Sequence, residues 1–315
     1  MTGVERFALR APLTSPFAPD LQAHAATLAR VTGIARFGRA RAGDLSFCDR
    51  LPLDGMAYVD ANVFVLCTAA LAPALSSIIP TATLLIVDQP RRSFIELASM
   101  LHHANRLEVT DRIPRPFGVH ASATIGHQAV VHPEARIDEN VRLGAHCVVH
   151  RGVWIKQGAC IEDGTVLGCD GINAFASGDG GVLPFPHLAG LVVGAGVRIG
   201  ANAVIVGGVL TSTEIGDGCI IGNLCNIGHG VVLGTRAWIS VGSCVGGHSV
   251  LGDRVTVGMA SAIRDNVSIG EGAQIGMGSV VVKDVLAQRS VFGNPARPVP
   301  PIAAGPVRES PASNG

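Results

Sequence analysis

Residues 215–234 read IGDGCIIGNLCNIGHGVVLG, and a branched aliphatic residue stands at every sixth position of this stretch. These residues are Ile215, Ile221, Ile227 and Leu233. A period of six differs from the period of two of an ordinary strand and from the 3.6 of an α-helix. It is typical of short strands joined by sharp corners, with one aliphatic side chain of each strand pointing inward.

The same period covers more than half of the chain in three runs, over residues 119–167, 193–205 and, after a slip of four residues, 215–281. The runs hold nine, three and twelve branched aliphatic residues, twenty-four in all. With three sides to a coil, they predict a parallel β-helix of about eight coils. The aliphatic side chains are then expected to form continuous columns inside a three-sided prism.

The remainder of the chain lacks this period. Residues 1–112 predict a small α/β domain, and residues 113–297 contain the β-helix. The Pro-rich tail 298–315 has the composition of a disordered end. Within the small domain the expected elements are a strand at 63–67, a helix at 69–79, a strand at 83–87 and a helix at 92–104. Segment 168–190 is too long for a corner and is a candidate functional loop.

Composition excludes several classes of protein. The chain has 24 basic and 24 acidic residues and no block of Lys or Arg, so nucleic acid is not an expected partner. The eight cysteines lack zinc-like spacing and predict reduced thiols in a cytoplasmic protein. The uncharged stretch between Asp60 and Asp88 is interrupted by Pro73 and Pro80, so no membrane span is expected. The N-terminus lacks the apolar region of a signal peptide.

His229 is the strongest candidate for a catalytic residue. It follows the inward Ile227 by two positions, so it is expected at or beside a corner of the prism, exposed to a substrate. A histidine held on a rigid corner between glycines has a pKa suited to proton abstraction. The alternative is a solvated corner residue without a function.

Three local patterns carry a resemblance to a known family. The first is N-x-C-x-I-x-H, from Asn223 to His229. The second is G-x-D-G at 168–171, and the third is the segment AGDLSF at 42–47. In these patterns the chain resembles the hexapeptide-repeat acyltransferases, whose fold is the left-handed β-helix. Among them it is most similar to the UDP-3-O-acylglucosamine N-acyltransferases of lipid A biosynthesis.

The resemblance implies a set of site residues. His229 corresponds to the family's general base, and Gly247 to the glycine whose backbone N–H stabilises the oxyanion. Phe47 corresponds to the residue that stacks on uracil, which makes residues 1–112 a nucleotide-binding (uridine-binding) domain. Further candidates for substrate binding are Asp170, Asn173, Asn223, Asn226 and His248. Alternatives remain open: Asp170 could cap its loop, Phe47 could be a core residue, and His248 could lie on a surface or at an interface.

The same resemblance implies the donor and the assembly. The acyl group would come from a pantetheine thioester of acyl carrier protein or coenzyme A, and it would move to the amine of a nucleotide-linked sugar. No bound cofactor and no metal would be required. The enzyme would be a cytoplasmic homotrimer with active sites between neighbouring prisms.

Some positions depart from the family. Val206-Gly207-Gly208 replaces Asp-Arg-Gly, Asn266 stands where a second His is expected, and Leu53 stands in place of a Tyr beside the uracil. The ending Gly293 to Arg297 is similar to that of coenzyme-A-dependent sugar acetyltransferases. An N-acetyltransferase for nucleotide amino sugars of surface polysaccharides is therefore the alternative.

Two further readings belong to other classes of protein. The first is a non-catalytic β-helical scaffold. The second is a γ-type carbonic anhydrase, which has the same prism and binds zinc through three histidines at a subunit boundary. His127 and His132 lie five positions apart, but no third ligand follows at the family's distance, so no metal site is predicted.

Overall fold

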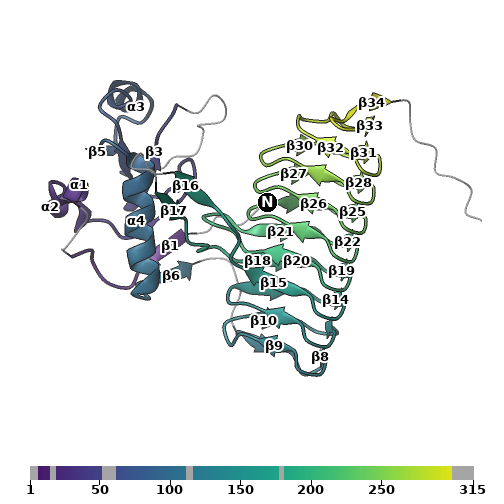
Figure 1. Ribbon diagram of the computed structural model, residues 1–315. Coiled ribbons are helices and arrows are strands. Elements are labelled where there is room, and N and C mark those ends of the chain that lie inside the picture. The colour runs from purple at the N-terminus through teal and green to yellow at the C-terminus, as the bar shows by residue number, and fades with distance from the viewer. Residues whose placement is uncertain (1–5, 15–18, 52–61, 111–115, 177–180, 300–315) are drawn as a thin grey trace, which may run out of the picture.

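The computed structural model describes residues 6–14, 19–51, 62–110, 116–176 and 181–299. Figure 1 shows a mixed sheet with its helices at the N-terminal end and a tall three-sided stack of coils after it. The N-terminal sheet has the strand order β5-β4-β3-β2-β1-β6. Its strands are β1 (Arg6–Leu9), β2 (Gly33–Ile34), β3 (Asp44–Cys48), β4 (Phe64–Cys67), β5 (Thr83–Ile86) and β6 (Leu107–Thr110).

Four helices accompany this sheet: α1 (Pro19–Gln22), α2 (Ala25–Leu28), α3 (Ala72–Ile78) and α4 (Pro90–His103). Strands β2 to β5 run parallel, while β1 pairs antiparallel with both β2 and β6. The strands and helices predicted between residues 63 and 104 are confirmed as β4, α3, β5 and α4, with shifts of one to three residues at most ends. The α/β character of this part follows from that alternation.

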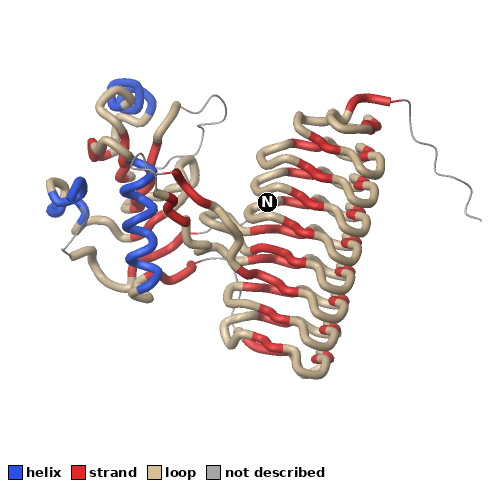
Figure 2. The backbone as a smooth tube through the Cα atoms, in the orientation of Figure 1, coloured by secondary structure: helices blue, strands red, loops and turns tan. Residues whose placement is uncertain are grey.

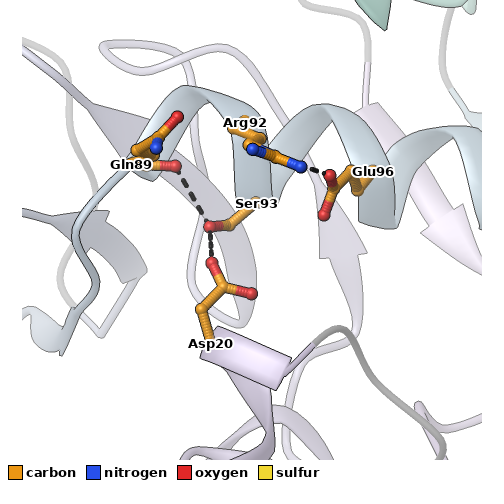
Figure 3. A network of polar contacts seen from close by, with 5 residues as sticks. All are labelled: Asp20, Gln89, Arg92, Ser93 and Glu96. Carbon is orange, nitrogen blue, oxygen red and sulfur yellow. Dashed lines mark hydrogen bonds and ion pairs between the residues drawn. The ribbon is translucent and has the colours of Figure 1, made fainter. Parts of the chain in front are cut away.

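Helix α4 is fixed at its N-terminal end. It begins with Pro90, a residue favoured in the first helical turn because its missing N–H would have no partner there. The buried Ser93 donates to the carbonyl oxygen of Gln89 and pairs with the carboxylate of Asp20 in α1 (Figure 3). Phe94 packs in the core beneath the helix. These contacts fix the first turn of α4, which faces the β-helix.

Three sheets form the sides of the prism (Figure 2), and their strands pair in parallel except for the last two strands of the second sheet, which pair antiparallel. The first consists of β7 (Gly118–Val119), β10 (Arg136–Ile137), β13 (Val153–Ile155), β18 (Leu191–Val193), β21 (Thr213–Ile215), β24 (Val232–Leu233), β27 (Val250–Leu251) and β30 (Ser268–Ile269). The second consists of β8 (Thr124–Ile125), β11 (Arg142–Leu143), β14 (Cys160–Ile161), β19 (Arg198–Ile199), β22 (Ile220–Ile221), β25 (Trp238–Ile239), β28 (Thr256–Val257), β31 (Gln274–Ile275), β33 (Ser290–Phe292) and β34 (Arg297–Val299). The third consists of β9 (Val130–Val131), β12 (Val148–Val149), β15 (Val166–Cys169), β20 (Val204–Val206), β23 (Asn226–Ile227), β26 (Cys244–Val245), β29 (Ala262–Ile263) and β32 (Val280–Val281).

The strands β7 to β32, apart from one inserted hairpin, make the eight coils that the hexads predict, in a left-handed parallel β-helix. The inward aliphatic residues from Ile137 onward are buried in one continuous core. Val119 and Ile125 are 45% and 38% exposed, because the first coil forms one end of the described stack. Burial of these columns is the main source of stability for a rod with few large rings.

The corners are held by backbone and carboxylate contacts between coils. The Ala195 N–H donates to Oδ1 of Asp217, 2.8 Å away on the next coil. A Cβ on Gly194 would lie 2.6 Å from the Asp217 nitrogen, so only glycine permits the coils to approach this closely. Asn223 has the same role one corner further on, where its Oδ1 accepts from the Ala201 N–H at 3.0 Å.

The two interruptions of the hexad period are where the prism meets the N-terminal sheet. The first carries the hairpin β16 (Ala174–Ala176) and β17 (Val182–Pro184), which lies beside α4 in Figure 1. The second is the slip of four residues in the period, in the segment 207–212 between β20 and β21. Phe185, Val209 and Leu210 from these two segments pack in one core with residues of the sheet and α4. The insert and the slip therefore attach one part of the chain to the other.

The cysteines and the helices complete the description. All eight cysteines are free. Buried Cys219 and Cys225 donate their thiols to backbone carbonyls of the next coil. None of the helices in the described part of the chain combines the length and the apolar character that a membrane crossing needs.

Adjacent residues of β22 provide a matched test of the aliphatic columns. Ile221 is 1% exposed and Ile220 is 46% exposed. Replacing Ile221 with Ala should lower the free energy of unfolding by about 2–5 kcal/mol, because it leaves a cavity between coils. Ile220→Ala should cost clearly less. Chemical denaturation at one protein concentration measures both, and equal losses would contradict the assignment of the inward face.

Candidate active site

A cavity of about 960 Å³ lies where the prism, the insert and the N-terminal sheet meet. The sheet and α4 contribute Arg36, Phe37, Phe47, Cys48, Asp49, Arg50, Leu51, Arg91 and Ile95 to its wall. The insert and the slip contribute Ile172, Asn173, Ala174, Phe175, Phe185, Val209, Leu210 and Thr211. The prism contributes His229, Gly247, His248, Asp265 and Asn266.

His229 follows β23 and lies against the next coil. The repeat places Gly247 eighteen residues later, one full coil away, since Ile227 is paired with Val245. A Cβ on Gly247 would lie 2.6 Å from Nε2 of His229, so the ring rests directly on the glycine backbone. Within the described residues, no hydrogen bond is recorded from the Gly247 N–H. A free amide donor therefore lies beside the imidazole.

The environment of His229 favours the neutral ring. Burial lowers its pKa, and the charge of Asp265 only partly opposes this effect. Its Nδ1 is buried without a hydrogen-bond partner in the described part of the chain. The neutral imidazole can accept a proton at neutral pH, which is the state that a general base requires.

Two more imidazoles enclose this ring. The centroid of His248 lies 4.7 Å from that of His229 with an interplanar angle of 78°, and that of His187 lies 5.6 Å away at 80°. Burial lowers the pKa of His248 to about 4, with smaller contributions from His229 and Arg36. Burial also lowers the pKa of His187, which the charge of Asp170 partly offsets. All three rings are therefore neutral at physiological pH.

On the opposite wall an arginine lies between aromatic rings. The guanidinium carbon of Arg91 is 5.7 Å from the ring centre of Phe47 and 5.8 Å from that of Phe175. Its Nε is 2.8 Å from Oδ2 of Asp49, and no hydrogen bond from its terminal nitrogens to a described residue is recorded. Phe47 also packs on Phe94, with ring centres 5.1 Å apart. This wall offers a planar cation and an aromatic edge to a ligand.

The structure brings five of the eight predicted site residues to the cavity: Phe47, Asn173, His229, Gly247 and His248. Asp170 is exposed and lies outside the cavity lining, and its charge raises the pKa of His187. Asn223 and Asn226 lie elsewhere, the first at the corner described above and the second on the outer face of β23. The prediction about Leu53 falls outside the described residues.

Sequence reasoning missed two cavity residues that carry function-related chemistry, Arg91 and Asp265, and a third residue, His187, which packs against the ring of His229 from outside the lining. His187 stands inside the insert that the broken period marks, and that break was the available signal. Arg91 precedes the apolar face of α4 and carries no motif of its own. Two departures from the family pattern lie in or near the site. Asn266 lines the cavity. Val206 packs closely on Gly171 in the insert, since a Cβ on that glycine would lie 2.7 Å from Cγ1 of Val206.

A resident metal has no candidate ligand set here. The described residues contain no group of three His, Cys, Asp or Glu side chains placed to hold an ion. Nε2 of His187 accepts from the Gly171 N–H at 3.2 Å. The cluster is therefore a packed set of neutral rings.

Comparison with known proteins gives the family. The UDP-3-O-acylglucosamine N-acyltransferase of Bordetella bronchiseptica is 30% identical over 270 residues, which cover 73% of this chain and 69% of the relative. The chain belongs to the UDP-3-O-acylglucosamine N-acyltransferase family. The Bordetella pertussis member is 29% identical over the same shares, and the Shewanella denitrificans member is 35% identical over 34% of this chain and 28% of its own.

Two other comparisons add little to this assignment. No protein-family model matches the chain. Among solved structures, the UDP-N-acetylglucosamine O-acyltransferase of Moraxella catarrhalis is 25% identical over 57% of this chain and 71% of its own, with a TM-score of 0.40.

The neutral histidines of this family member predict acid lability. Burial lowers the pKa of His248 in the folded chain from its ordinary value of 6.5 to about 4, so the unfolded chain binds the proton more tightly. Its contribution to stability is full above pH 6.5 and is lost as pH falls toward 4. His248→Gln should therefore reduce the fall in Tm between pH 7 and 4.5 by about 2 °C.

Differential scanning fluorimetry across that range measures the slope. His127→Gln, at an exposed position on the first coil, serves as the matched control. An unchanged slope in His248→Gln would contradict the burial of a neutral imidazole at this position.

Proposed function

We propose that this chain is an N-acyltransferase that moves an acyl group from a pantetheine thioester to the amine of a nucleotide-linked amino sugar. Membership of the family supports UDP-3-O-acylglucosamine, a precursor of lipid A, as the acceptor. The single observation that carries the proposal is the neutral His229, set beside an unpartnered backbone N–H at one end of a large cavity. A general base and an oxyanion donor are the two groups that acyl transfer between bound substrates needs.

The chemistry needs one base and one oxyanion donor. As the sugar nitrogen attacks the thioester carbonyl, His229 removes its proton, and the Gly247 N–H donates to the oxyanion of the tetrahedral intermediate. The attack forms the C–N bond, and collapse of the intermediate restores the C=O bond and breaks the C–S bond. The leaving thiolate takes the proton from the imidazolium. The thioester has a good leaving group, so positioning and these two groups suffice.

The opposite wall is suited to the nucleotide. Arg91 and Phe47 present a cation and an aromatic ring, which match the diphosphate and the base of a nucleotide sugar. Asn173 lines the cavity between the two walls, within reach of the sugar. In this proposal residues 1–112 form the nucleotide-binding domain and residues 113–297 the acyltransferase domain.

A cytoplasmic homotrimer is part of the proposal. The outer face of the third sheet presents a row of mostly apolar side chains that Asn226 interrupts: Val130, Val148, Val166, Val204, Asn226, Cys244, Ala262 and Val280. Val130 is 60% exposed. A mostly apolar row of this kind fits a flat interface with further copies of the chain. Size-exclusion chromatography with light scattering gives the mass; a monomer would remove this part of the proposal.

The donor and acceptor are decided by a thiol-release assay. Acetyl-coenzyme A, 3-hydroxyacyl-coenzyme A and 3-hydroxyacyl carrier protein are each combined with amino-sugar nucleotides that carry or lack the 3-O-acyl chain. Turnover restricted to the carrier-protein donor and the acylated UDP-glucosamine is the expected result. Turnover with acetyl-coenzyme A would instead assign the N-acetyltransferase activity of polysaccharide synthesis.

Removal of the base gives the first kinetic prediction. His229→Ala should lower kcat by about a hundredfold to ten-thousandfold, the range for a general base, with KM little changed. His127→Ala is the matched control, because that exposed histidine lies on the first coil outside the cavity lining. Retention of kcat in His229→Ala would overturn the assignment of the base.

Arg91 gives the second kinetic prediction. Arg91→Ala should raise KM for the nucleotide sugar about tenfold, equivalent to about 1.4 kcal/mol, and change kcat much less. Arg91→Lys should restore only part of the affinity, because an ammonium cannot stack on Phe47 in the same way. The matched control is Arg30→Ala, since Arg30 lies over Phe64, 5.6 Å from its ring centre, and outside the cavity lining. Equal KM values for the Arg91 and Arg30 variants would remove Arg91 from the substrate site.

A further inference from the structure

His187 reaches the site from the insert between β15 and β18. It is 9% exposed and lies between Phe185 and Ala189, both buried in the core that joins the insert to the N-terminal sheet. The insert closes on itself, since the Phe185 N–H donates to the carbonyl oxygen of Asn173 at 2.7 Å. The ring of His187 therefore belongs to the best-anchored part of the insert.

A backbone hydrogen bond fixes the orientation of this ring. The Gly171 N–H donates to Nε2 at 3.2 Å. Since Nε2 accepts, the single proton of the neutral ring is on Nδ1. The first and last parts of the insert thus hold one neutral tautomer between them.

The ring of His187 is one of two imidazoles that enclose His229. His187 and His248 meet it nearly perpendicularly on different elements, one from the insert and one from the next coil. Gly247 forms the floor beneath the ring. The charged groups around the cluster are Asp265, which acts on His229 and His248, Arg36, which acts on His248, and Asp170, which acts on His187. Because burial lowers the pKa of both neighbouring rings, neither places a full positive charge beside His229 at neutral pH.

We propose that His187 is a positioning residue for the base: its fixed neutral ring holds His229 against Gly247 and excludes water from the buried Nδ1 edge. This rests on the proposed role of His229. Because Asn173 and Phe175 of the same insert line the cavity, His187 links the segment that meets the substrate to the residue that takes the proton. The insert then serves both substrate binding and the alignment of the base.

Kinetics against pH separate this role from a structural one. In His187→Ala, water reaches His229 and stabilises the imidazolium, so the acid limb of kcat/KM should move up by about half a pH unit. The kcat should fall about tenfold through misalignment of the base, with smaller changes in KM. His187→Gln keeps an acceptor for the Gly171 N–H and most of the volume, and it should restore most of kcat. Val182 lies on the hairpin of the same insert and is 70% exposed, so Val182→Ala should leave both the acid limb and kcat unchanged.

A second readout does not depend on activity. Diethyl pyrocarbonate modifies neutral imidazoles, and peptide mass spectrometry resolves the rate at His229 from those at the other histidines. His187→Ala should raise that rate at pH 7 and shift its pH midpoint upward, and His187→Gln should reverse both effects.

The two readouts distinguish the possible failures. If the wild-type protein acylates no acceptor but the His229 modification responds as expected, the proposed function fails and the shielding by His187 stands. If the enzyme is active and His187→Ala changes neither the acid limb nor the modification rate, the inference is overturned. A loss of kcat with both of these unchanged would reduce His187 to a loop anchor and would also overturn it.

Discussion

The stacking of aliphatic side chains at a six-residue period is the constraint on which everything else in this protein depends. Each uninterrupted coil takes eighteen residues, and the inward residue of each strand lies directly on that of the coil before it, as Ile227 pairs with Val245. Any residue that follows an inward position is thereby fixed relative to its counterpart one coil away. His229 and Gly247 are such a pair, so the repeat that builds the core also builds the contact between the base and the oxyanion donor.

The repeat alone would give a rod with solvent on all sides. The cavity exists because the period breaks twice on one side, and the two segments released there carry Phe185, Val209 and Leu210 onto the N-terminal sheet. Apolar burial at this junction holds α4 and the insert opposite the prism. The chemistry therefore lies at the one place where the regular structure is interrupted, and a loop on a rigid scaffold supplies the variable part of the site.

Burial without charge compensation sets the electrostatics of this site. Three imidazoles pack against one another, and desolvation lowers the pKa of each. The same low polarity that keeps His229 neutral also strengthens a hydrogen bond from the Gly247 N–H to a developing negative charge. One physical condition thus prepares both the base and the oxyanion donor, at the expense of stability in acid.

The sequence by itself determined the prism, its number of coils, the inward residues and, in the N-terminal part, the elements β4, α3, β5 and α4, because all of these follow from local periodicity. It also determined the contact of His229 with Gly247, since eighteen residues separate neighbours on adjacent coils wherever the period is unbroken. Tertiary structure alone decided which outward residues share a cavity. His187 reaches His229 from an insert, and Arg91 reaches the same cavity from a helix far away in the chain. No local period encodes either approach. Asn223 resembled a substrate ligand in the sequence, but the corner geometry uses its side chain to hold the Ala201 N–H, because an unpaired backbone donor at a tight corner would be costly.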